Sequence, residues 1–181
     1  MPGLLKTIDK DSLLRAIVLA KAKADIQYLK LKWKGFDIRH VDKTDAEKLK
    51  KDQSIQTMLL RNRNDCQRKY VERFVAEYRI QIKDSYDLDD IKLIQRSFND
   101  IYGREKYRIH LFQVDGNDCN RLWSGATPSQ RNIVIIQFNG HFDVPKNMTK
   151  LLKKSSFCFD CLDLQRFKNS HRCAWTCRSC G

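Results

Sequence analysis

The sequence has no apolar run close to the ~20 residues that a membrane-spanning helix needs, which argues against a helical membrane anchor. Met1 to Lys10 lack the basic-then-apolar pattern of a secretory signal peptide. Internal repeats and low-complexity segments are also missing. The 181 residues suit one compact domain plus a small appendage, and we expect an intracellular protein.

Acidic residues are scarce relative to basic ones. The chain has 35 Lys and Arg against 22 Asp and Glu, which gives a net charge of +13. An excess of this size favours contact with the phosphates of nucleic acid. The alternative interpretation is a solvated, lysine-rich surface.

The seven cysteines are unevenly placed, with five of them in the last 24 residues. An odd, clustered set does not fit a secreted disulfide scaffold, whereas clustered cysteines in a reducing compartment more often bind metal. Cys66 and Cys119 stand apart, and we interpret them as ordinary thiols.

Apolar spacing predicts helical stretches over residues 12–23, 24–33, 44–61 and 67–77. Asp11 or Ser12 can cap the first, which is expected to bury one apolar face (Leu13, Leu14, Ile17 and Val18). Gly35 is expected to end the second, and Thr44 can cap the third.

Strand patterns follow in the second half of the chain. Residues 78–82 and 107–114 alternate apolar with polar positions, and residues 115–117 mark a turn. The continuous apolar run 133–136 predicts a strand over 132–138 that is buried on both faces. Helices before strands indicate an α+β domain over residues 1–150, joined by a basic connector (146–156) to a module over residues 151–181.

That module reads Cys-x2-Cys-x9-His-x-Cys-x3-Cys-x2-Cys and predicts a structural Zn²⁺ site, which would also stabilise a segment with few apolar residues. The preferred ligands are Cys158, Cys161, His171 and Cys173, with Cys177 and Cys180 forming half of a second site. A rival ligand set uses Cys158, Cys161, Cys177 and Cys180. A third interpretation is that the cysteines are free thiols that bind no metal. Because the chain stops at Gly181, directly after Cys180, we expect a truncated gene product.

Two distant segments together resemble the signature segments of ovarian-tumour-type (OTU) cysteine proteases, a papain-like fold. The first is Asp9-Lys10-Asp11-Ser12-Leu13-Leu14-Arg15-Ala16, and the second is His141-Phe142-Asp143. The resemblance implies that Ser12 stands at the position of the nucleophilic cysteine, that His141 is the base and that Asp143 orients it. Asp9 and Arg15 match the remainder of the first motif.

The same resemblance predicts a vestigial, inactive site. A serine hydroxyl is much harder to deprotonate than a thiol, and Lys10 replaces the glycine that the family has before the nucleophile. We expect Ser12 to lie within about 6 Å of His141, allowing for the loose geometry of an empty site. The simpler alternative is that Ser12 is a helix cap and His141 a strand-end histidine.

Both segments together with the cysteine module, in this order and spacing, resemble the region ahead of the exonuclease domain in Maverick/Polinton polymerases. These are protein-primed, family-B DNA polymerases of transposons and related viruses. The resemblance implies a non-catalytic N-terminal piece of a DNA-directed DNA polymerase that works in DNA replication. Its expected partners are DNA, a replication protein or the remainder of a polymerase, in the nucleus, with neither a membrane nor ubiquitin as partner.

Basic residues surround the predicted zinc site and are the expected phosphate contacts: Lys146, Lys150, Lys153, Lys154, Arg166, Lys168, Arg172 and Arg178. Two alternatives stay open. One is an OTU-like protease that cleaves ubiquitin or processes itself, with Ser12 in place of cysteine. The other is a zinc-stabilised module for protein interaction.

Overall fold

A computed structural model of the chain describes residues 4–5, 12–34, 54, 64–115, 118–126, 129–151, 156–157 and 164–165. Gly35 and nearly all of the helix predicted over 44–61 lie outside the described residues. Within the described part of the chain, no helix is both long and apolar enough to cross a membrane.

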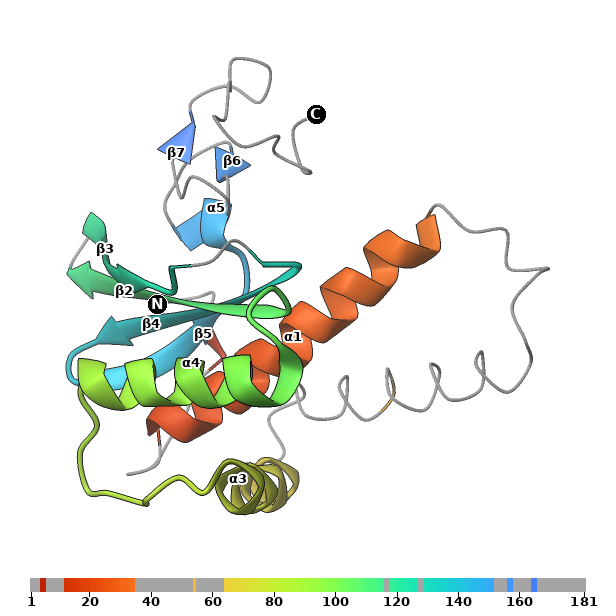
Figure 1. The fold of residues 1–181 in the computed structure, drawn as a ribbon. Coiled ribbons are helices and arrows are strands. Elements are labelled where there is room, and N and C mark those ends of the chain that lie inside the picture. The colour runs from red at the N-terminus through yellow and green to blue at the C-terminus, as the bar shows by residue number, and fades with distance from the viewer. Residues whose placement is uncertain are drawn as a thin grey trace.

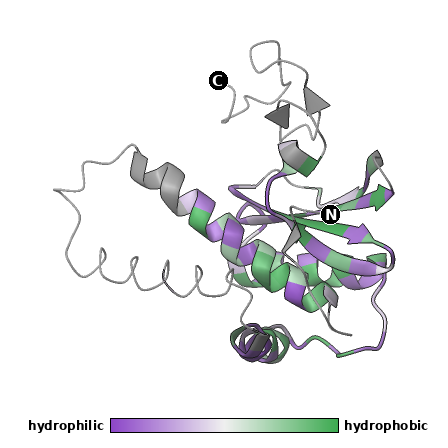
Figure 2. Cartoon of the chain, turned by 180° about the vertical axis from the view of Figure 1, so that it is seen from behind, coloured by the Kyte–Doolittle hydropathy of each residue, from purple (hydrophilic) through white to green (hydrophobic). Residues whose placement is uncertain are grey.

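The first helix, α1, runs without a break over Ser12–Lys34. The prediction of two separate stretches was therefore wrong; no glycine or proline interrupts this segment, so nothing stops the helix near Lys23. The prediction of a single apolar face was also incomplete, because every residue from 12 to 20 is buried. Figure 2 shows α1 as largely hydrophobic where it crosses the sheet, as expected for a helix enclosed on all sides.

Helix α3 (Asn64–Tyr78) confirms the predicted short helix and buries Val71 and Phe74. The strand predicted over 78–82 was wrong: Tyr78 ends α3, and Ile82 is 60% exposed in an irregular segment. The alternation of apolar and polar residues spans only five positions, and the first of them already belongs to α3.

Helix α4 (Leu88–Tyr102) was not predicted, although its sequence signals are clear. The Asp87 side chain accepts hydrogen bonds from the backbone N–H groups of Asp89 and Asp90. Asp90 in turn accepts from the backbone N–H of Asp87, which completes a capping box. Ile91, Ile94 and Phe98 then bury one face of the helix.

Five strands form one mixed sheet in the order β1-β5-β4-β2-β3. They are β1 (Leu4–Leu5), β2 (Tyr107–Asp115), β3 (Asp118–Ser124), β4 (Arg131–Phe138) and β5 (His141–Pro145). Strands β2 and β4 are parallel, and the other neighbours are antiparallel. The predictions of β2 and β4 are confirmed, whereas β3 and β5 were not predicted as strands.

Both faces of the sheet are covered, as predicted for β4. Ile133 and Ile135 belong to the main core with α1, α3 and α4, while Val134 and Ile136 belong to a smaller cluster on the opposite face. Figure 1 shows the three long helices on one side of the sheet and the short helix α5 (Met148–Leu151) on the other. The predicted α+β class is thus confirmed.

Candidate functional site

Ser12, the expected vestigial nucleophile, is the first residue of α1 and is buried. Its Oγ accepts a hydrogen bond of 3.4 Å from the backbone N–H of Phe142, which lies 130 residues further along the chain. The structure therefore brings together the two segments that the sequence singled out. The contact joins the start of α1 to β5, beside His141.

His141 and Asp143 are placed by a tight hairpin between β4 and β5. Asn139 and Gly140 form the two-residue turn, with φ of 49° and 76°, the left-handed conformation that a type I′ turn requires. Asn-Gly is the strongest short hairpin signal in a sequence, and it could have predicted β5. His141 follows the turn and is exposed.

Strand alternation separates Asp143 from the core around α1. Phe142 and Val144 belong to that core, so Asp143 between them belongs to the opposite face of the sheet. Asp143 lies directly across from Ile136, a member of the smaller cluster, and is itself buried. Ser12 therefore meets the main chain of β5 from the face that Asp143 does not occupy.

A row of three hydrogen-bonded polar side chains, which the sequence analysis missed, lies on the face of the sheet that points away from α1. His110 is completely buried; its Nδ1 lies 2.9 Å from Ser124 Oγ and its Nε2 lies 2.8 Å from Asn132 Oδ1. Because an amide oxygen only accepts, Nε2 carries the proton and Nδ1 accepts from the Ser124 hydroxyl. Burial lowers the pKa of His110 to about 4, so the imidazole is neutral near pH 7. An enclosed imidazole of this kind links β3, β2 and β4 and offers no access to a substrate.

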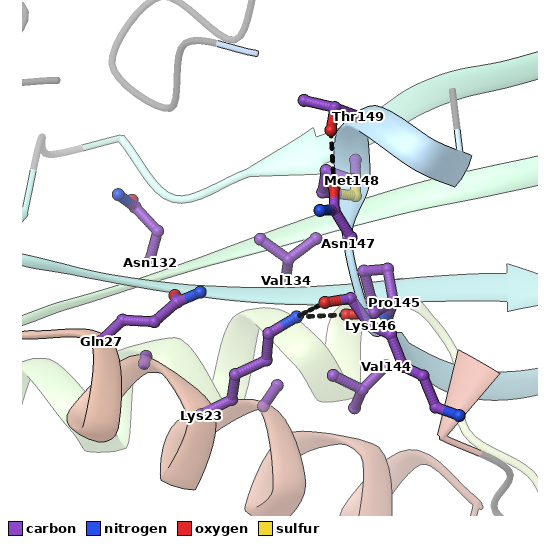
Figure 3. A pocket seen from close by; sticks show the side chains of 12 residues that line it. Lys23, Gln27, Asn132, Val134, Val144, Pro145, Lys146, Asn147, Met148 and Thr149 are labelled. Atoms are coloured by element: carbon purple, nitrogen blue, oxygen red, sulfur yellow. Dashed lines mark hydrogen bonds between the residues drawn. The ribbon is translucent and has the colours of Figure 1, made fainter. Parts of the chain in front are cut away.

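Lys23 lies at a cavity of about 190 Å³ between α1, the first half of β4 and the segment after β5 (Figure 3). Its ammonium donates to the backbone carbonyls of Pro145 and Lys146. Burial lowers the pKa of Lys23 to about 8. No sequence motif marks this residue, because the cavity is assembled from elements more than 100 residues apart.

The predicted zinc ligands Cys158, Cys161, His171, Cys173, Cys177 and Cys180 all lie outside the described residues. Two short strands flank the first pair in the chain: β6 (Ser156–Phe157) is antiparallel to β7 (Leu164–Gln165). The Cys-x2-Cys pair therefore falls in the connection of a small hairpin. In the part of the chain that the structure describes, no group of three or more His, Cys, Asp or Glu could hold a metal ion.

Of the eight predicted phosphate contacts, the structure describes the side chain of Lys146 alone, which is exposed at the end of β5. Lys150 lies in α5, and the other six lie outside the described residues. Cys66 and Cys119 are free and half-buried, as expected for ordinary thiols.

Comparison of the chain with protein-family models, curated proteins and solved structures finds no match.

Proposed function

We propose that the chain is a catalytically silent, OTU-like domain that carries a zinc-stabilised, nucleic-acid-binding segment. The contact between Ser12 Oγ and the Phe142 N–H carries this proposal, because an OTU-like fold requires these two segments to meet. The relation to Maverick/Polinton polymerases and a place in the nucleus belong to the same proposal. In that setting the domain docks DNA or a replication protein and leaves polymerisation to other domains.

Three features support the absence of hydrolysis. Position 12 is a serine, whose hydroxyl needs a strong base for activation. Its oxygen already accepts a backbone hydrogen bond. Asp143 belongs to the face of the sheet opposite α1, so it is poorly placed to orient a base toward Ser12.

Nucleic-acid binding is supported by charge and by the strands around the cysteines. The net charge is +13, and eight of the basic residues fall between positions 146 and 178. The β6–β7 pairing brings together the chain before and after the Cys158/Cys161 pair, and basic residues lie on both sides of it: Lys153 and Lys154 before β6, Arg166 and Lys168 after β7. A zinc ion bound by the cysteines would hold these basic flanks together. Several cations would then face a phosphate backbone together.

A fluorescence titration of labelled duplex DNA at several salt concentrations tests this function. Four or five phosphate contacts predict a slope of log K against log salt of about −4. Lys168→Ala and Arg172→Ala should each make the slope shallower by about one unit. Lys69→Ala, on the exposed surface of α3, is the matched control and should leave the slope unchanged. Absence of binding at low salt would favour a zinc module for protein interaction instead.

A further inference from the structure

The cavity beside Lys23 exists because β5 diverges from β4. Strand β2 pairs with β4 over Arg131–Gln137, whereas β5 pairs with its last three residues, Ile136–Phe138. The first half of β4, before Ile136, does not pair with β5. The cavity lies between this part of β4 and the chain after β5, with α1 on one side and α5 on the other (Figure 3). At about 190 Å³ it is smaller than the roughly 300–1,000 Å³ of sites for drug-sized ligands. A small ligand or a single chemical group fits this volume.

The lining of the cavity is positive. Its twelve residues include no aspartate or glutamate and two lysines, of which Lys23 reaches toward the cavity while the side chain of Lys146 extends away from it (Figure 3). The other polar members are Gln27, Asn132, Asn147 and Thr149. The surroundings therefore favour a negatively charged ligand.

Lys23 is the central group of this cavity. Two of its three N–H bonds donate to the carbonyls of Pro145 and Lys146, the second at 2.9 Å. These neutral acceptors compensate the lost hydration of the ammonium incompletely, in keeping with its lowered pKa. An anion in the cavity would supply the missing charge and accept the third N–H bond.

Asn132 offers a second donor whose orientation is fixed. Its Oδ1 is engaged by His110 Nε2 at 2.8 Å, so its amide nitrogen is the end that remains as a donor. The hydrogen bonds from Ser124 through His110 thus fix the orientation of the Asn132 amide, which lines the cavity.

We propose that this cavity is an oxyanion site that binds a phosphate group through Lys23 and Asn132. Two sources share this chemistry: free inorganic phosphate, or the phosphorylated end of a nucleic acid. The site belongs to the α+β domain, and its existence does not depend on the cysteine module.

The test follows the Lys23 side-chain resonance of the whole chain by NMR during titration with potassium phosphate, at constant ionic strength kept with chloride. Saturable binding and a rise of the Lys23 pKa by about one unit or more are expected, because a nearby anion favours the charged amine. Lys23→Met should weaken phosphate binding about tenfold or more, the loss typical of a charge-assisted hydrogen bond. Lys69→Met removes the same charge from the exposed surface of α3 and should leave binding unchanged.

Asn132→Asp keeps the Lys23 hydrogen bonds to the backbone and the side-chain oxygen that accepts from His110. It replaces the amide donor by a negatively charged acceptor and should weaken phosphate binding about tenfold or more, which covers the case in which Lys23→Met fails to fold. A 5′-phosphorylated oligonucleotide that binds more tightly than its unphosphorylated form, in a Lys23-dependent way, identifies a nucleic-acid end as the source. If the two oligonucleotides bind equally while inorganic phosphate binds saturably, free phosphate is the ligand of the site. An unchanged Lys23 resonance, or full affinity in a folded Lys23→Met variant, overturns the proposal. Lys168→Ala and Arg172→Ala should leave phosphate binding intact, which separates this site from the proposed DNA contacts.

Discussion

The carboxylate of Asp25 on α1 accepts a 2.6 Å hydrogen bond from the guanidinium of Arg131, the first residue of β4. The Tyr107 hydroxyl donates to the same oxygen at 2.8 Å. Both charged side chains are largely buried, with 9% and 17% exposed. Arg131 also stacks 4.3 Å from the centroid of the Tyr28 ring. This buried group fixes α1 against the start of the parallel strand pair.

Asp25→Asn should lower the free energy of unfolding by about 3 kcal/mol, because removing one partner leaves the buried Arg131 charge uncompensated. Urea unfolding measures the change. Asp89→Asn is the control: Asp89 pairs with Lys92 at 2.7 Å, but its side chain is 79% exposed. That exposed pair should contribute less than about 1 kcal/mol. Equal effects of the two substitutions would contradict a stabilising role for the Asp25–Arg131 pair.

Ser12→Ala should change stability slightly and activity not at all. The long hydrogen bond from Phe142 predicts a loss of about 0.5–1 kcal/mol on substitution. Wild type and variant should both fail to cleave ubiquitin chains or to process the chain itself. Ser97→Ala, which removes a serine hydroxyl bonded within α4, controls for a generic serine effect. Turnover by the wild type that Ser12→Ala abolishes would show an active hydrolase.

Protein purified without chelator should contain at least one zinc ion per chain. Cys161→Ser should release the zinc by removing a ligand common to both predicted sets, whereas Cys66→Ser, a free thiol on α3, should retain it. Cys177→Ser separates the two sets: the first zinc persists if His171 and Cys173 are ligands and is lost in the rival arrangement. Metal-free protein with an equally ordered C-terminal segment would refute the zinc prediction.

His110 should make the protein less stable in mild acid. Its folded-state pKa of about 4 lies below the value of 6.5 for an unperturbed histidine. The unfolded chain therefore binds more protons between these two pH values, and the stabilisation is complete above pH 6.5 and lost as the pH falls toward 4. The loss amounts to about 3 kcal/mol in total.

Urea unfolding of wild type and His110→Gln across this pH range measures the contribution, since glutamine keeps a polar group but does not titrate. His141→Gln, which replaces an exposed imidazole on β5, is the matched control for the substitution of a histidine by glutamine. The same slope in His110→Gln as in wild type would assign the acid sensitivity to other groups.

Local sequence signals determined much of the fold. The apolar run 133–136 specified a strand buried on both faces, and the structure places its alternate side chains in two separate clusters. The capping pair Asp87/Asp90 specified the start of α4, and Asn139-Gly140 specified the β4–β5 turn, although neither was used in the prediction. These features depend on residues close together in the chain, so the sequence contains the information to find them.

Only the tertiary structure decided which polar side chains of the domain lie close together. Ser12 meets β5 across 130 residues, and the strand pleat, which alternates side chains between faces, placed Asp143 away from it. The Lys23 cavity depends on where β5 separates from β4, a property of strand register that no local pattern encodes. Sequence alone predicted the start of α1, helix α3, the buried strand β4 and the spacing of the cysteines. Long-range packing decided which side chains face one another, because such contacts depend on how distant elements are oriented rather than on the residues beside them in the chain.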